Sequence, residues 1–178
     1  MKLLQPKLWV DHLQDIPLKQ LKTVGIKGLI VDIDNTLVAW DAEEPSHLVR
    51  EWIAEAKNLG FQVVLVSNNK TPRVEKMQAY FMCRGLSRAK KPTTGALKKA
   101  MRLMKLNRSQ IAIIGDQIFT DVLGGNRIGI YTILVSPIKS KEFWWTQLVR
   151  PVEERVLRKL KKFHRLVITE EDTGEQEK

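Results

Sequence analysis

The chain alternates short apolar runs with longer amphipathic stretches, and this alternation limits its fold more than any other feature. Four runs predict buried strands: GLIVDI (28–33), FQVVLVSNN (61–69), QIAIIGD (110–116) and IYTILV (130–135). Amphipathic stretches predict helices at 46–60, 71–85, 93–107 and near 119–126. Strands that are apolar throughout are typical of parallel sheets covered by helices on both faces. The sequence therefore predicts an α/β fold: a three-layer αβα, Rossmann-like domain with a mostly parallel sheet.

Local signals mark the ends of two of these helices. Ser46 is the predicted N-cap of the helix at 46–60, and Gly60 is its predicted stop. Thr71 is the predicted N-cap of the next helix, with Pro72 at its first position.

Polar side chains follow the predicted strands at the points where they end. Asp32 and Asp34 come at the end of the first strand, Ser67 and Asn68 follow the second, Asp116 follows the third, and Lys91 lies on the loop before the helix at 93–107. The carboxyl ends of parallel strands meet at one edge of the sheet, where ligands bind. A buried, unpaired carboxylate is costly, so this grouping predicts a functional site.

Length and composition indicate one domain. The 178 residues are 43% hydrophobic, which is enough for a single core. We expect this domain to span 1–168, with the motif-bearing part at 27–135. The tail TEEDTGEQEK (169–178) lacks apolar residues and is predicted to be disordered.

The sequence predicts a cytoplasmic protein that is soluble or peripheral to a membrane. Cys83 is the single cysteine, so it forms no internal disulfide, and we expect a buried, inert thiol. The longest apolar runs hold about six to eight residues, against the roughly 20 that a spanning helix needs. The segment at 1–15 breaks too early for a signal peptide.

The net charge of +10 is unevenly distributed along the chain. Residues 31–68 carry seven acidic and two basic side chains, whereas 69–110 carry twelve basic and one acidic, a local charge of +11. A second basic stretch, 139–165, has a charge of +6. Such stretches favour large anionic partners, either a membrane surface or a nucleic acid.

The polar strand ends carry a family resemblance. DIDNT (32–36) resembles the DxDxT/V signature of the haloacid-dehalogenase-like (HAD) phosphohydrolases, and VVLVSNN (63–69) resembles their second motif. Lys91-Pro92 resembles the third motif and GDQIFTD (115–121) the fourth. The wider stretches around these motifs resemble the YqeG-type branch of subfamily IIIA, which includes phosphatidylglycerophosphate phosphatases.

The residue types fit phosphoryl transfer. A carboxylate can attack phosphorus and form an aspartyl-phosphate, and Asp32, first in the motif, is the expected nucleophile. Asp34 is the expected general acid and base. Lys91 would supply positive charge to the phosphoryl group and to Asp32, while Ser67 and, more weakly, Asn68 would bind the phosphoryl oxygens.

A magnesium site is expected beside these groups. Mg²⁺ prefers hard oxygen ligands, which Asp32 and Asp116 can supply. The resemblance implies that the backbone carbonyl of Asp34 also binds the metal, and that Asp121 acts through water or from behind the direct ligands.

The spacing of the motifs leaves no room for a cap domain. Asp32 and Ser67 are 35 residues apart and Ser67 and Lys91 are 24 apart, whereas an independent domain needs on the order of 50 residues. The sequence therefore predicts a capless enzyme in which VAWDAEEP (38–45) forms only a small flap. An open site suits a phosphate group carried by something large.

The segment at 139–165 allows two interpretations. Its aromatic cluster, Phe143, Trp144 and Trp145, and its basic amphipathic pattern are typical of helices that lie on a membrane surface. The same pattern fits a terminal helix that packs its apolar stripe on the sheet.

The site residues and the family resemblance together imply a Mg²⁺-dependent phosphomonoesterase that converts phosphatidylglycerophosphate to phosphatidylglycerol at the cytoplasmic face of a membrane. A phosphatase of a soluble metabolite or nucleotide is the first alternative. A nucleic-acid or ribosome-associated binding protein is the second, suggested by the sequence pI of about 9.8. No DNA partner is expected, RNA is disfavoured because no RNA-binding motif is recognised, and the oligomeric state is left open.

Overall fold

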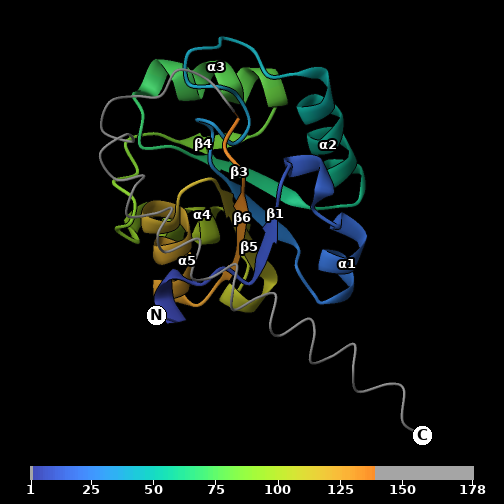
Figure 1. Ribbon diagram of the computed structural model, residues 1–178, viewed down its shortest axis with the longest axis vertical. Coiled ribbons are helices and arrows are strands. Elements are labelled where there is room, and N and C mark those ends of the chain that lie inside the picture. The colour runs from blue at the N-terminus through green and yellow to red at the C-terminus, as the bar shows by residue number, and fades with distance from the viewer. Residues whose placement is uncertain (1, 139–178) are drawn as a thin grey trace, which may run out of the picture. The chain divides into compact units, whose positions relative to one another are not determined.

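The computed structural model describes residues 2–138, which form a six-stranded sheet between two layers of helices (Figure 1). The strands are β1 (Leu8–Val10), β2 (Gly28–Val31), β3 (Gln62–Val66), β4 (Arg84–Leu86), β5 (Ile111–Gly115) and β6 (Tyr131–Val135). The helices are α1 (Leu18–Thr23), α2 (His47–Asn58), α3 (Thr71–Phe81), α4 (Gly95–Met104) and α5 (Leu123–Ile128), and a π-helical turn, Ile118–Val122, precedes α5. The predicted segments at 139–165 and 169–178 lie outside the described residues.

The sheet has the order β1-β6-β5-β2-β3-β4, and all of its strand pairs are parallel. β2 lies near the centre, where Ile30 pairs with Val64 of β3 on one side and Ile113 of β5 on the other. The carboxyl ends of β2, β3 and β5 therefore meet at one edge. This confirms the predicted parallel sheet.

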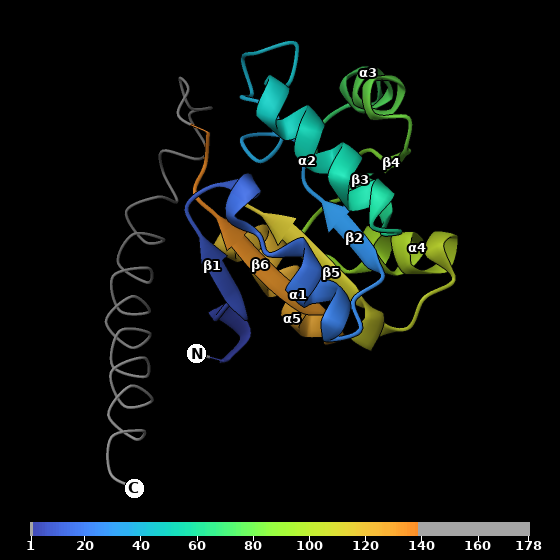
Figure 2. The ribbon, with the colours of Figure 1, turned by 90° about the vertical axis from the view of Figure 1, so that its right-hand side faces the viewer.

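Helices cover both faces of the sheet (Figure 2). On one face the apolar side chains of α1, α2 and α3 pack against alternate residues of the strands, such as Leu29, Leu65 and Ile114. On the other face α4 packs its Leu97 and Ala100 on the remaining residues, such as Ile30, Val64 and Ile113. Burial of each large apolar side chain contributes about 1.5–3 kcal/mol. The three-layer αβα prediction is thus confirmed.

Two strands were absent from the sequence prediction. β1 pairs with β6 at one edge of the sheet, and β4 pairs with β3 at the other. The predicted helix at 71–85 runs into β4, whereas α3 ends at Phe81 because Met82 adopts a left-handed backbone conformation (φ 46°). A three-residue strand is too short to show a periodic pattern.

The predicted ends of α2 are confirmed, but the predicted start of α3 is wrong by one residue. Ser46 caps α2 by accepting a hydrogen bond from the Val49 amide (3.4 Å), and Gly60 takes a positive φ of 87° beyond its end. Lys70 is the N-cap of α3, and Thr71 is its first helical residue. The Thr71 hydroxyl is instead 3.1 Å from the Ser87 hydroxyl and bonds to it.

The described chain carries no inserted cap domain. Between β2 and β3 it contains only the segment at 32–46, α2 and a short connection, and between β3 and β4 only α3 with short connections. Within residues 2–138, no helix is both long enough and apolar enough to cross a membrane.

Candidate active site

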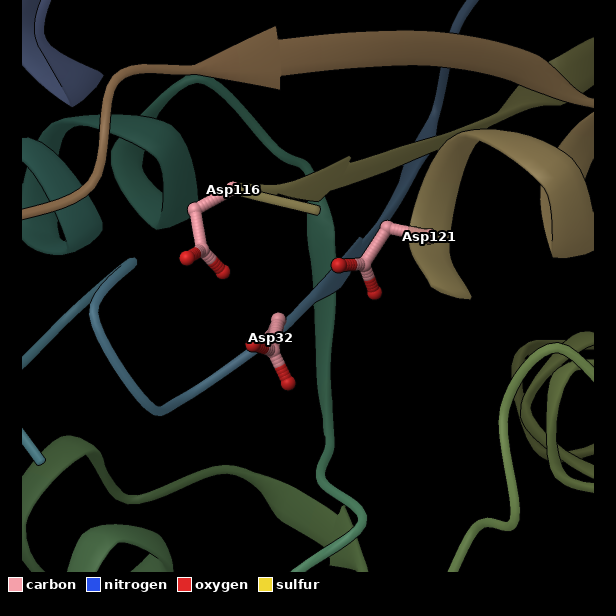
Figure 3. Close-up of side chains that lie close together, drawn as sticks. All are labelled: Asp32, Asp116 and Asp121. Atoms are coloured by element: carbon pink, nitrogen blue, oxygen red, sulfur yellow. The ribbon is translucent and has the colours of Figure 1, made fainter. Parts of the chain in front are cut away.

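Three aspartates converge at the carboxyl edge of the sheet. Asp32 follows β2, and its amide donates to the Ile114 carbonyl of β5 (2.9 Å), which fixes its backbone between the two central strands. Asp116 follows β5, and Asp121 lies in the π-helical turn. Figure 3 shows the three side chains grouped at this edge, and one carboxylate oxygen from each lies within 4.8 Å of the others.

Lys91 lies between two of these carboxylates. Its Nζ donates to Oδ1 of Asp32 (2.5 Å) and to Oδ1 of Asp121 (2.6 Å). All three side chains are less than 10% exposed, so these charges are little screened by water. A buried ion pair with good geometry and further hydrogen bonds can offset the cost of desolvation.

Asn68 positions Lys91 through its backbone. Its Oδ1 accepts from the Lys91 amide (2.7 Å), and its Nδ2 donates to the Lys91 carbonyl (3.2 Å). The end of β3 and the loop before α4 are thereby joined. Both ends of the Asn68 amide thus bind Lys91 in this structure.

The cluster has more negative charge than Lys91 can balance. Burial, and then the carboxylate of Asp121, raises the pKa of Asp32 to about 7, although Lys91 opposes the shift. Burial, followed by Asp32 and Asp121, raises the pKa of Asp116 well above its usual 3.8. Burial would lower the pKa of Lys91, but Asp121 and Asp32 together raise it, so Lys91 stays charged. The site can accommodate a further cation.

The donor set fits a hard divalent metal. Asp32, Asp116 and Asp121 each offer a carboxylate oxygen to the same volume, and oxygen ligands suit Mg²⁺ better than they suit soft metals. Thr36 donates its hydroxyl to Oδ1 of Asp116 (3.4 Å), which orients that carboxylate. The three aspartates could therefore hold a metal ion.

Asp34 lies beside this cluster with different partners. Ser67, at the end of β3, donates its hydroxyl to Oδ2 of Asp34 (2.9 Å) and accepts from the Asn69 amide (2.9 Å). The Asp34 charge is close enough to contribute to the raised pKa of Asp32. The structure thus brings all seven residues singled out in the sequence to one edge of the sheet.

Arg73 is a further residue of the site that the sequence reasoning missed. From the first turn of α3, its Nε donates to Oδ1 of Asp34 (2.6 Å) across 39 residues of sequence. The available signal was a basic residue in the first helical turn, where the helix dipole disfavours positive charge by about 0.3–1 kcal/mol.

Comparisons with known proteins identify the family of this chain. A model of the family described as Mitochondrial PGP phosphatase matches residues 1–139. The chain is 40% identical over 161 residues to the Probable phosphatase YqeG of Bacillus subtilis. This alignment covers 90% of this chain and 94% of that protein. It is 28% identical over 170 residues to Phosphatidylglycerophosphate phosphatase 1 of Arabidopsis thaliana, chloroplastic/mitochondrial, covering 86% of this chain but 47% of the plant protein.

A solved structure supports the fold. The cobalt-bound deoxy-D-mannose-octulosonate 8-phosphate phosphatase of Haemophilus influenzae matches with a TM-score of 0.51 at 20% identity, over 64% of this chain and 70% of that chain. This likeness concerns the backbone arrangement, whereas the family match and the Bacillus subtilis relative concern the sequence itself. The family resemblance of the four motifs is thus confirmed, and the chain belongs to the PGP phosphatase family of HAD-type phosphatases.

Proposed function

We propose that this phosphatase is a Mg²⁺-dependent phosphomonoesterase that removes the terminal phosphate of phosphatidylglycerophosphate through a phosphorylated Asp32. The observation that carries the proposal is the pair of carboxylates two residues apart with different surroundings. Asp32 is held by Lys91 in the acidic cluster, and Asp34 is held outside it by Ser67 and Arg73. Two carboxylates in unlike environments suit two different roles.

The first step uses both carboxylates. A carboxylate oxygen of Asp32 attacks phosphorus as the bond between phosphorus and the leaving alcohol breaks. Asp34, in its acid form, donates its proton to the leaving oxygen. The products of this step are the free alcohol and the acyl phosphate on Asp32.

The second step reverses the role of Asp34. As a carboxylate it takes a proton from water, whose oxygen attacks phosphorus while the bond to Asp32 breaks. Inorganic phosphate leaves, and Asp32 is regenerated. Ser67 and Lys91 would bind the phosphoryl oxygens in both steps, and Asn68 would act mainly by holding the backbone of Lys91.

Asp32, Asp116 and the backbone carbonyl of Asp34 would hold Mg²⁺, with Asp121 bound through water or behind the direct ligands. The metal would offset the negative charge of the phosphoryl group and of the carboxylates. The raised pKa values of Asp32 and Asp116 support this role, because they reflect first the burial of these carboxylates and then their mutual repulsion, which Lys91 only partly offsets.

Three observations support a lipid substrate. The Arabidopsis thaliana and Chlamydomonas reinhardtii relatives are named phosphatidylglycerophosphate phosphatases, although the chain spans about half of the length of each, 47% and 59%. The described chain carries only a short flap beside the site. The stretch at 69–110 has a charge of +11, which suits an anionic lipid surface at the cytoplasmic face of a membrane.

The test is phosphate release from phosphatidylglycerophosphate in mixed micelles, measured beside a panel of soluble phosphomonoesters. We expect kcat/KM for the lipid to exceed that for each soluble ester by at least about 10²-fold, and EDTA to stop turnover reversibly. Asp32→Asn, purified in the same way as the parent, should abolish turnover because the nucleophile is lost. Equal activity on soluble esters would contradict the lipid assignment, and turnover by Asp32→Asn would contradict the covalent mechanism.

A further inference from the structure

We propose that Arg73 is a positioning residue for the reaction, which holds the Asp34 carboxylate in its working orientation and ties it to the flap backbone at 39–42. The inference rests on the acid–base role proposed above for Asp34. It adds a residue to the site and gives the short flap a part in catalysis.

The guanidinium of Arg73 uses three nitrogens on three partners. Nε donates to Oδ1 of Asp34 (2.6 Å), Nη2 to the carbonyl of Ala39 (2.9 Å) and Nη1 to the carbonyl of Ala42 (3.0 Å). One side chain of α3 thus joins the strand end that carries Asp34 to the loop that follows it. A Lys side chain has a single nitrogen and cannot reproduce this planar fork.

Asp34 is held from both sides. Its Oδ1 accepts from Arg73 and its Oδ2 accepts from the Ser67 hydroxyl (2.9 Å). The side chains of Asp34 and Arg73 are 23% and 19% exposed, so the ion pair is only partly screened by water. An acid–base carboxylate works only when it lies within hydrogen-bond reach of the leaving oxygen. The hydrogen bonds from Arg73 and Ser67 restrict the orientation of the Asp34 carboxylate.

The place of Arg73 in α3 argues that its position serves the site. A positive side chain in the first turn opposes the helix dipole, and this first turn has no acidic residue to offset it. The charge of Arg73 therefore does not stabilise the helix at this position. The favourable interactions of Arg73 are its hydrogen bonds to Asp34 and to the flap carbonyls.

Lys76 provides a matched control on the same helix. One turn after Arg73, its Nζ pairs with Oε2 of Glu43 in the same flap (2.7 Å), but both side chains are well exposed and neither touches Asp34. Lys76→Gln removes one positive charge and one contact between α3 and the flap. The substitution leaves the hydrogen bonds from Arg73 and Ser67 to Asp34 intact.

The experiment compares Arg73→Gln, Arg73→Lys and Lys76→Gln on two soluble esters, glycerol phosphate and p-nitrophenyl phosphate. An alkoxide leaving group needs a proton, whereas p-nitrophenolate leaves readily without one. We expect Arg73→Gln to lower kcat on glycerol phosphate about 10²-fold with KM within about threefold. The rate of the p-nitrophenolate burst, which reports the first step, should fall far less than kcat on glycerol phosphate. Arg73→Lys should lie between Arg73→Gln and the parent protein, and Lys76→Gln should match the parent.

Asp34→Asn separates this inference from the proposed function. If Arg73 acts through Asp34, adding Arg73→Gln to Asp34→Asn should cause no further loss of kcat. An inactive Asp34→Asn beside a fully active Arg73→Gln would overturn the inference alone. A fully active Asp34→Asn would overturn the acid–base assignment, and the inference with it.

Two measurements distinguish a loss of stability from a misplaced Asp34 carboxylate: the Tm of thermal unfolding, and the comparison of the two esters with their different leaving groups. Equal losses on both esters, matched by a lower Tm, would show that Arg73 only supports the fold and would overturn the inference. If Arg73→Gln does not fold, Arg73→Lys decides. It keeps the charge, so its loss should again be larger for glycerol phosphate than for the p-nitrophenolate burst.

Discussion

At the scale of single residues, the site concentrates like charge that folding alone does not require. Asp32, Asp116 and Asp121 face one another, and Lys91 is the cation bonded to two of them. Burial of these carboxylates raises the pKa of Asp32 and of Asp116, which means that their ionisation costs folding free energy. Such a local conflict between charge and burial is characteristic of functional sites.

Removal of one of these charges should separate stability from function. Asp116→Asn takes a like charge out of the cluster, so we expect the metal-free variant to have a higher Tm than the metal-free parent. Mg²⁺ at about 100 times its Kd should stabilise the parent by about 2.7 kcal/mol but leave the variant nearly unchanged. The variant should also lose turnover. Thermal unfolding with and without Mg²⁺ measures these shifts, and a variant that still gains stability from Mg²⁺ would contradict the ligand role of Asp116.

The same charges set the direction of the pH dependence. The folded pKa of Asp32, about 7, lies above its ordinary 3.8, so the folded protein binds this proton more tightly than the unfolded chain does. The stabilisation is complete below about pH 4 and is lost as the pH rises through about 7. The metal-free protein should therefore melt higher at pH 5 than at pH 7.5, and Mg²⁺ should stabilise it more at pH 7.5.

Some residues of the site could be predicted from the sequence, and others could not. The rule that parallel strands end at one edge predicted that Asp32, Ser67 and Asp116 would lie together, and they do. The ion pair of Arg73 with Asp34 was missed because it joins a helix to a loop across 39 residues, and no periodic pattern marks such a contact. Cys83 is only partly buried, whereas a buried thiol was predicted, but burial still raises its pKa to about 11, which fits an inert thiol.

At the scale of elements, the sequence predicted the layers better than the edges. The four predicted strands are β2, β3, β5 and β6, whose apolar runs are buried on both faces of the sheet. The two missed strands, β1 and β4, are three residues long and lie at the edges, so burial leaves little pattern in them. Short edge strands depend on pairing with a neighbour already in place, which no local signal can report.

The join between β5 and the π-helical turn depends on one glycine. A Cβ added at Gly115 would lie 2.6 Å from the Cβ of Asp121 and closer still to its carboxyl group. Asp121 is buried and bonded to Lys91, so it has little room to shift. We expect Gly115→Ala to destabilise the protein by about 1–3 kcal/mol and to lower kcat more than 10²-fold, measured by thermal unfolding and by turnover.

Gly95→Ala is the matched control for this substitution. Gly95 begins α4, and a Cβ there would meet nothing within 4 Å. Alanine is the better helix former by about 0.8–1 kcal/mol in a helix interior, so this variant should be as stable as the parent or slightly more so. If Gly115→Ala behaved like Gly95→Ala, the close packing of Asp121 on β5 would not be needed for its position.

At the scale of the whole molecule, charge is distributed unevenly along the chain, and the basic stretch supplies both site residues such as Lys91 and exposed surface cations. The acidic stretch at 31–68 contributes Asp32 and Asp34, whereas the stretch at 69–110 carries +11. Part of that charge lies on α4, where Lys98, Lys99 and Arg102 are exposed. The predicted role of 139–165 at a membrane lies outside the described residues and stays a prediction. The exposed cations of α4 can be tested on their own.

We expect the protein to float with vesicles that contain phosphatidylglycerol and far less with neutral vesicles. Each cation near an anionic surface contributes about 1 kcal/mol, and screening shortens its reach from about 10 Å at 0.1 M salt to about 3 Å at 1 M. Combined substitution of Lys98, Lys99 and Arg102 by Gln should therefore weaken binding by up to about 10²-fold. Turnover of a soluble ester should not change.

The matched control replaces Lys19, Lys22 and Lys27, three exposed cations in and after α1, by Gln. It changes the net charge equally but on segments that belong to the opposite layer from α4. If the α4 surface meets the membrane, the α4 variant should lose more vesicle binding and more lipid turnover than the α1 variant. Equal losses would mean that net charge alone attracts the protein to the vesicle. Binding that resists 1 M salt would point to inserted apolar side chains, because screening cannot remove a hydrophobic contact.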